Sequence, residues 1–124
     1  MLTWLLIALA GCSNTVQIEV EYPTCVDWTP GEEGAIEVAQ DGDDWRVTHS
    51  SVVQGCDDAF DPDVVGDGKI LTVHEHWEAQ TEDDCTICFD PTIVLIDPPR
   101  GSYELGWYEE GSVDAVDVIA FEVE

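Results

Sequence analysis

The pattern of hydrophobic and polar residues along this chain predicts β-strands. From Val16 to Tyr22 apolar and polar residues alternate without interruption, which is typical of a strand with one buried face. No segment of useful length has the 3.6-residue repeat of an amphipathic helix. Further segments with strand character follow, and they cover residues 36–38, 45–53, 69–78, 92–96, 103–107 and 113–123.

Turn-forming residues separate these segments. Asp41-Gly42 is a strong hairpin signal, and Pro30-Gly31 breaks the chain before the second strand. Residues 54–68 are rich in Asp, and we expect them to form a long acidic loop. In the last strand the apolar phase slips at Val118-Ile119, which predicts a β-bulge there.

Seven short strands with turns at this spacing predict an all-β fold, an antiparallel β-sandwich over residues 16–124. The turn Pro99-Arg100-Gly101-Ser102-Tyr103 resembles the Pro-Gly-x-Tyr corners of bacterial immunoglobulin-like and prealbumin-like modules, with Arg100 inserted into the pattern. This resemblance implies that the roughly seven strands have an immunoglobulin-like arrangement.

The start of the chain has a different character from the rest. Residues 2–10 form an apolar run without a charged residue, which is too short to cross a bilayer as a helix and is typical of an export signal. The run leads into Leu9-Ala10-Gly11-Cys12, which resembles the lipobox of bacterial lipoproteins. The alternative interpretation is that this run is an ordinary first strand or helix of the domain.

The lipobox resemblance implies a location for the protein. It implies that residues 1–11 are a cleaved signal peptide, that Cys12 is lipidated on its thiol, and that residues 12–15 are a short tether. In such lipoproteins Ser13 after the cysteine permits sorting to the outer membrane. We therefore expect a bacterial envelope protein that is held on the outer membrane by acyl chains and faces the periplasm or the cell surface.

The charge of the chain excludes some partners. There are 28 acidic residues and three Lys or Arg, which gives a formal net charge of −25. Binding to a nucleic-acid backbone requires basic residues, so we expect no nucleic-acid partner. An anionic lipid surface would not attract this protein either, and the lipid anchor must hold it there. We interpret most of the acidity as surface solvation rather than as cation binding.

Four cysteines remain besides Cys12. An even number in a small exported domain indicates two disulfides, and strand direction selects among the three possible pairings. If successive strands alternate in direction, Cys25 and Cys56 lie at one end of the sandwich, and Cys85 and Cys88 lie at the other. We therefore predict the disulfides Cys25–Cys56 and Cys85–Cys88. A thioredoxin-like role for Cys85 is disfavoured, because no helix follows it.

Several residues are candidate metal ligands. His74 and His76 project to the same side of a strand, and with His49, or with Cys85 and Cys88, they would resemble a zinc site. We favour the interpretation that they are exposed histidines on an acidic surface beside Glu75 and Glu78.

The acidic segment offers a second, weaker possibility. Counted from Asp61 it fails the EF-hand pattern, since Val65 stands at position five, which requires Asp or Asn, and Thr72 stands at position twelve, which requires Glu. Asp61, Asp63 and Asp67 would therefore hold Ca²⁺ only weakly, and we expect no resident cofactor.

The sequence contains no organised set of nucleophile and base. We therefore expect a non-catalytic binding or envelope-interaction module, with an envelope protein or a glycan as its partner. Trp28 and Tyr108 are candidate exposed aromatic residues for such a contact. The alternative is a small metal-dependent hydrolase that uses His49, His74 and His76.

Overall fold

The structure is a computed structural model, and it describes residues 3–8, 15–26, 29, 34–80 and 84–124. These residues contain strands and turns, and no helix among them is long and apolar enough to cross a bilayer. The strands are β1 (Thr3–Ala8), β2 (Thr15–Glu21), β3 (Ile36–Asp41), β4 (Asp44–His49), β5 (Val52–Gly55), β6 (Ala59–Phe60), β7 (Asp63–Asp67), β8 (Ile70–His74), β9 (Trp77–Glu78), β10 (Thr86–Phe89), β11 (Thr92–Ile96), β12 (Gly101–Tyr108) and β13 (Ala115–Val123).

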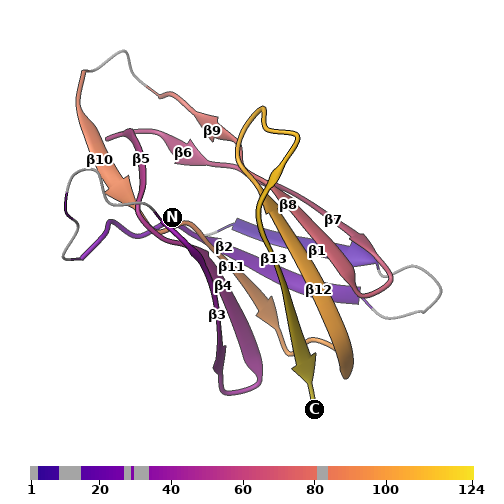
Figure 1. Cartoon of the computed structure of the whole chain (residues 1–124). Coiled ribbons are helices and arrows are strands. Elements are labelled where there is room, and N and C mark those ends of the chain that lie inside the picture. The colour runs from indigo at the N-terminus through magenta and orange to yellow at the C-terminus, as the bar shows by residue number, and fades with distance from the viewer. Residues whose placement is uncertain (1–2, 9–14, 27–28, 30–33, 81–83) are drawn as a thin grey trace.

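Two sheets pack face to face, and the all-β sandwich predicted from the sequence is confirmed (Figure 1). Sheet I has the strand order β1-β2-β11-β4-β3, with all neighbours antiparallel. Sheet II has the order β13-β12-β8-β7. Within sheet II, β12 and β8 run parallel, whereas the other strand pairs among the described residues are antiparallel.

The core lies between these two sheets. On β2 the alternation seen in the sequence is confirmed, because Val16, Ile18 and Val20 are buried. Burying each such side chain contributes about 1.5–3 kcal/mol, so the alternation is what holds sheet I against sheet II. The other fully buried large side chains come from β4 and β11 in sheet I and from β8 and β12 in sheet II, and they are Val47, Ile93, Leu95, Leu71, Val73, Tyr103, Leu105 and Trp107.

The side chain of Tyr103 holds the turn that leads into β12. The hydroxyl of Tyr103 donates a hydrogen bond of 2.6 Å to the carbonyl oxygen of Pro99. This bond satisfies a buried phenol and holds the β11–β12 connection against the sheet, as a tyrosine corner does.

Two strand pairs continue beyond the sandwich and bend as they leave it (Figure 1). The β4–β11 pair continues as the β5–β10 pair, and the bend falls at Ser51, where φ is 60°. The β7–β8 hairpin continues in the same way as the β6–β9 pair. Aromatic rings fill the space between the two extensions, and they belong to Tyr22, Phe60, Trp77 and Phe89.

Several expected element boundaries were wrong. Residues 54–68 do not form one long loop, because they include β6 and β7. Asp and Gly have low strand propensity, but pairing of β7 with β8 and of β6 with β9 overrides it. The strands expected at 45–53 and 69–78 are each divided in two by a bend.

The bulge in the last strand also lies elsewhere. Trp107 pairs with Asp117 and Tyr108 with Ala115, so the extra residue is Val116 and not a residue at 118–119. The bulge therefore lies close to the start of β13, where β12 ends.

The predicted disulfide pairing was wrong. The structure pairs Cys25 with Cys88 and Cys56 with Cys85, at Cα–Cα distances of 5.3 and 5.4 Å. Cys56 and Cys85 face each other because Gly55 and Thr86 are partners at the end of the β5–β10 pair. Cys25 reaches Cys88 through the neighbouring β-bridge between residues 24 and 89. Cys85 and Cys88 are three residues apart on extended chain, about 10 Å, which is beyond the reach of a disulfide.

The N-terminal apolar run is an edge strand in this structure. β1 pairs with β2 in an unbroken antiparallel register from Thr3↔Val20 to Ala8↔Thr15, so the alternative of a first strand is the arrangement observed. Cys12 and Ser13 lie outside the described residues. Cleavage before Cys12 and its lipidation therefore stay predictions.

Candidate functional site

A buried histidine–carboxylate pair joins the two sheets. His49 is the last residue of β4 and is 6% exposed, and Glu75 follows β8 and is 5% exposed. Nδ1 of His49 lies 2.9 Å from Oε1 of Glu75. A carboxylate only accepts hydrogen bonds, so Nδ1 is the donor and Nε2 is the ring nitrogen left for another partner.

Neighbouring groups fix both members of the pair. The backbone N–H of Glu75 donates to the carbonyl oxygen of Tyr108 at 2.9 Å, and the N–H of His49 donates to that of Pro91 at 3.0 Å. The indole of Trp107 meets the imidazole edge to face, with ring centroids 5.9 Å apart. The imidazole is therefore held in one orientation by a carboxylate, a backbone bond and a buried ring.

A cavity of about 580 Å³ opens beside this imidazole. It lies where β4 bends into β5, close to the start of β13. Its volume is within the range of small-molecule sites in proteins. The lining combines hydrogen-bonding side chains with valines, and the residues are Gly34, His49, Ser51, Val52, Val53, Gln54, Glu109 and Val116.

The wall of the cavity depends on two backbone features. A Cβ atom on Gly34 would lie 1.7 Å from the carbonyl oxygen of Ser50, so any side chain there would push the two segments apart. Ser51 has a φ of 60°, which is costly for a residue other than glycine. Its N–H donates to Oδ1 of Asp90 at 2.9 Å, and this bond helps to hold the bend that shapes the cavity.

The serine beside His49 in the sequence makes its hydrogen bonds elsewhere. The hydroxyl of Ser50 is engaged with Ala35, accepting from its N–H at 3.1 Å and donating to its carbonyl at 3.3 Å. In the part of the chain that the structure describes, no hydrogen bond joins a serine hydroxyl to His49. The nucleophile–base contact that acyl transfer needs is not formed there.

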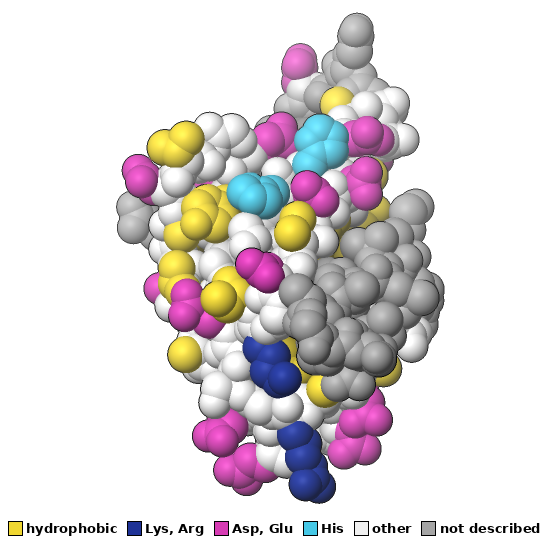
Figure 2. Space-filling model, turned by 90° about the vertical axis from the view of Figure 1, so that its right-hand side faces the viewer, with side chains coloured by type: hydrophobic (Ala, Val, Ile, Leu, Met, Phe, Trp, Pro, Cys, Tyr) yellow, Lys and Arg dark blue, Asp and Glu magenta, His cyan; other side chains and the backbone are white. Residues whose placement is uncertain are grey.

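The other two histidines lie apart from His49. His74 is exposed on the outer face of sheet II, where its ring stacks on the ring of Tyr108 with the two ring centroids 5.0 Å apart. His76 is 49% exposed in its side chain and lies between Glu110 and Glu78, at 3.2 and 3.7 Å. Figure 2 shows histidines on this face among hydrophobic and acidic side chains. The structure therefore does not assemble a site from the three histidines.

The candidate calcium ligands are also spread out. Asp63 and Asp67 are at opposite ends of β7, which at about 3.3 Å per residue separates them by roughly 13 Å. Asp63 pairs with His74 and Asp67 with Ile70. The N–H of Asp61 donates to the carbonyl of His76 at 2.8 Å, in the bend before β7. The geometry does not gather these three carboxylates around one ion.

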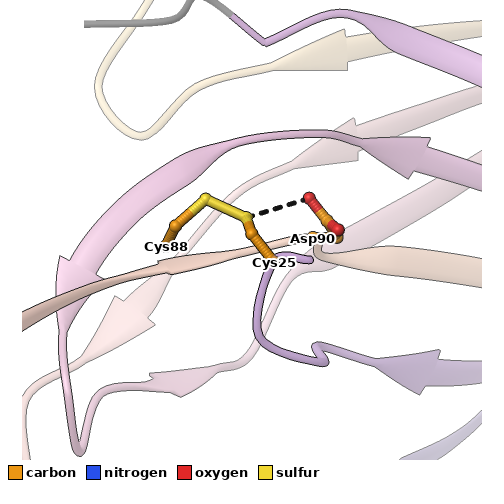
Figure 3. Close-up of side chains that lie close together, drawn as sticks. All are labelled: Cys25, Cys88 and Asp90. Carbon is orange, nitrogen blue, oxygen red and sulfur yellow. Dashed lines mark hydrogen bonds between the residues drawn. A yellow bond between two sulfur atoms is a disulfide. The ribbon is translucent and has the colours of Figure 1, made fainter. Parts of the chain in front are cut away.

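One group of possible ligand atoms does lie close together among the described residues, and it is formed by Cys25, Cys88 and Asp90 (Figure 3). The two sulfurs are joined as a disulfide, so neither is a thiolate ligand. Sγ of Cys25 lies 3.2 Å from Oδ1 of Asp90. This carboxylate also accepts from Ser51, so it connects the disulfide to the wall of the cavity.

Of the two candidate aromatic residues, the structure describes one. Tyr108 is partly exposed, and its ring covers Gly106, with Cε1 3.3 Å from the position of a Cβ on that glycine. Val65 and Val118 on the same face of sheet II are each 50% exposed. Trp28 lies outside the described residues.

The prediction that Glu75 lies on an acidic surface was wrong, although the sequence contains a signal for its burial. Leu71, Val73, Glu75 and Trp77 share one phase of the 69–78 segment, and all four are buried. A carboxylate on the apolar face of a strand needs a buried partner. His49 is in the same phase as Val47 on β4, so the alternation on the two strands indicates both members of the pair.

Comparison with protein-family models, with curated proteins and with solved structures finds no match to this chain.

Proposed function

We propose that this chain is an exported, lipid-anchored, non-catalytic binding protein of the bacterial envelope, and that the cavity beside His49 binds a neutral saccharide unit of an envelope glycan. The observation that carries the proposal is a buried imidazole, oriented by Glu75 through a 2.9 Å contact, at the wall of a cavity of about 580 Å³.

The lining of the cavity favours a saccharide. His49, Gln54 and Glu109 line the cavity, and their side chains are of types that donate to and accept from hydroxyl groups. Val53, which is 46% exposed, offers apolar surface to the C–H face of a sugar ring, while the lining residues Val52 and Val116 pack against the core. An anionic ligand would be repelled by the net charge of −25. A large apolar ligand would leave the polar groups of the lining unpaired.

The envelope location is inferred from the start of the chain. Lipidation at Cys12 would place the anchor three residues before β2, which begins at Thr15. Two disulfides are typical of an oxidising compartment. A rigid sandwich close to the membrane would present its cavity to glycans there, without a cofactor and without catalysis.

Calorimetric titration with neutral oligosaccharides of bacterial envelopes tests the proposal. Val53 lines the cavity and is 46% exposed, so Val53→Trp should fill the space without unfolding the protein. We expect at least tenfold weaker saccharide binding for this variant. Val65→Trp on the outer face of sheet II is the matched control, because Val65 is 50% exposed and distant from the lining. We expect it to bind as the wild type does.

Three results would contradict the proposal. Binding that Val53→Trp leaves unchanged would place the saccharide elsewhere on the protein. Binding of simple diamines but of no saccharide would show that the cavity recognises cations through Glu109. Hydrolysis of an ester or glycoside that is lost in His49→Gln would show an enzyme.

A further inference from the structure

The sequence predicts that residues 1–11 are cleaved off, but in the structure β1 belongs to this segment and is paired along its whole length in sheet I. β1 pairs with β2 over six residues, and Trp4 lies opposite Glu19 while Leu6 lies opposite Gln17. β1 also lies beside β7, the edge strand of sheet II. Figure 1 shows β1 and β7 next to each other along this side of the sandwich.

Removal of residues 1–11 would turn β2 into an edge strand. The backbone groups of residues 15–20 that now pair with β1 would lose their partners, while those that pair with β11 would keep theirs. Val16, Ile18 and Val20 point into the core and are 1% exposed or less. Loss of β1 would also uncover the side of the core between β2 and β7. An unpaired edge beside apolar surface is a template for another strand.

We infer that in the mature protein an extended segment of a partner protein adds to β2 as an antiparallel strand, in the place that β1 occupies here, with a Lys or Arg opposite Glu19. The inference rests on the signal-peptide cleavage contained in the proposed function. The docking edge on β2 would be a second site, separate from the glycan cavity at the bend between β4 and β5. The partner segment would be about six residues long, with apolar residues at alternate positions.

The charges of β2 set the preference for a basic residue. Gln17, Glu19 and Glu21 share the outer face of the strand. Glu21 already has an ion pair with Arg46. Partial burial, together with the carboxylate of Glu21, raises the pKa of Glu19, so this position is crowded with negative charge. A cation directly across the strand pair would relieve that repulsion.

The same charges argue against a second copy of this chain as the occupant. Antiparallel pairing of two β2 strands would place Gln17, Glu19 and Glu21 of one copy beside the same residues of the other. Like charges opposite each other destabilise a strand pair, and acidic edges are a common protection against self-association.

The test uses the full chain expressed in a bacterial host, with the mass of the purified protein measured first. A mass that begins at Cys12 with attached acyl chains establishes the processing step. Two synthetic peptides with the sequence of residues 3–8 are then titrated, one with Trp4→Lys and one with Trp4→Glu. We expect the lysine peptide to bind at least tenfold more tightly, and to slow hydrogen exchange at backbone amides of residues 15–20, which face β1 here.

Variants make the assignment specific. Glu19→Lys should reverse the preference between the two peptides. The matched control is Glu37→Lys on β3, which is exposed at the opposite edge of sheet I and should leave the preference unchanged. Equal affinities for the peptides, or protection away from β2, would overturn the inference while leaving the processing intact. A mass that retains residues 1–11 would overturn the processing step and, with it, the inference.

Discussion

Nδ1 of His49 and Oε1 of Glu75 are 2.9 Å apart. Both residues are buried, with His49 6% exposed and Glu75 5% exposed. One residue ends a strand of sheet I and the other follows a strand of sheet II. The pair is therefore a polar connection through the core, and it holds the imidazole at the wall of the cavity. Its contribution to stability and its contribution to binding can be separated by mutation.

We predict that His49→Ala destabilises the protein by about 3–5 kcal/mol, because it leaves the carboxylate of Glu75 buried without its partner. The double variant His49→Leu/Glu75→Leu should be clearly more stable than the single one, since it removes both polar groups and fills the space. Urea unfolding followed by tryptophan fluorescence measures both. Equal losses in the two variants would show that the pair is not the source of the effect.

We predict that peptide mapping without reduction finds Cys25 linked to Cys88 and Cys56 linked to Cys85. The sequence separations of 63 and 29 residues imply stabilisation of about 4 and about 3.5 kcal/mol through loop entropy in the unfolded chain. Cys25→Ala/Cys88→Ala should therefore be at least as destabilising as Cys56→Ala/Cys85→Ala. A peptide containing a Cys85–Cys88 link would contradict the structure.

We predict that Cys12→Ala abolishes membrane attachment. The wild-type protein should fractionate with the outer membrane, since several acyl chains anchor far more firmly than one, at about 0.8 kcal/mol per buried CH₂. The variant should accumulate as an uncleaved precursor or in the soluble fraction. Fractionation and labelling with a radioactive fatty acid measure this, and acyl label on the variant would show that another residue carries the lipid.

We predict a specific pH dependence for Glu19. Partial burial and the neighbouring Glu21 raise the pKa of this carboxyl above its ordinary value in the folded protein, so the folded state binds this proton more tightly than the unfolded state does. The stabilisation linked to that proton is present at about pH 4 and is lost as the pH rises through the folded-state pKa.

Comparison with an uncharged side chain measures this effect. The free energy of unfolding of Glu19→Gln, taken relative to that of the wild type, should be more favourable to the variant at pH 7 than at pH 4. The matched variant Glu37→Gln, on the exposed edge of β3, controls for the loss of one surface carboxylate. A stability difference for Glu19→Gln that does not change with pH would contradict the prediction.

Several features of this fold can be predicted from short stretches of consecutive residues. The alternation of Val16, Ile18 and Val20 identified the buried face of β2, because successive side chains of a strand point to opposite faces. Asp41-Gly42 marked the turn between β3 and β4, and Gly42 has a φ of 64° there. The same alternation predicts that Glu75 is buried, because Glu75 lies at every second position with Leu71 and Val73.

Other features were decided by tertiary structure alone. The pairing of Cys25 with Cys88 depends on which strands become neighbours after the chain bends at Ser51, where the backbone N–H is bonded to Asp90. The contact of His49 with Glu75 depends on how sheet I is placed over sheet II. Alternation is set by the geometry of a single strand, so it can be read from consecutive residues. The neighbours of a strand are chosen by packing between segments far apart in the chain, and a single sequence carries no direct record of that choice.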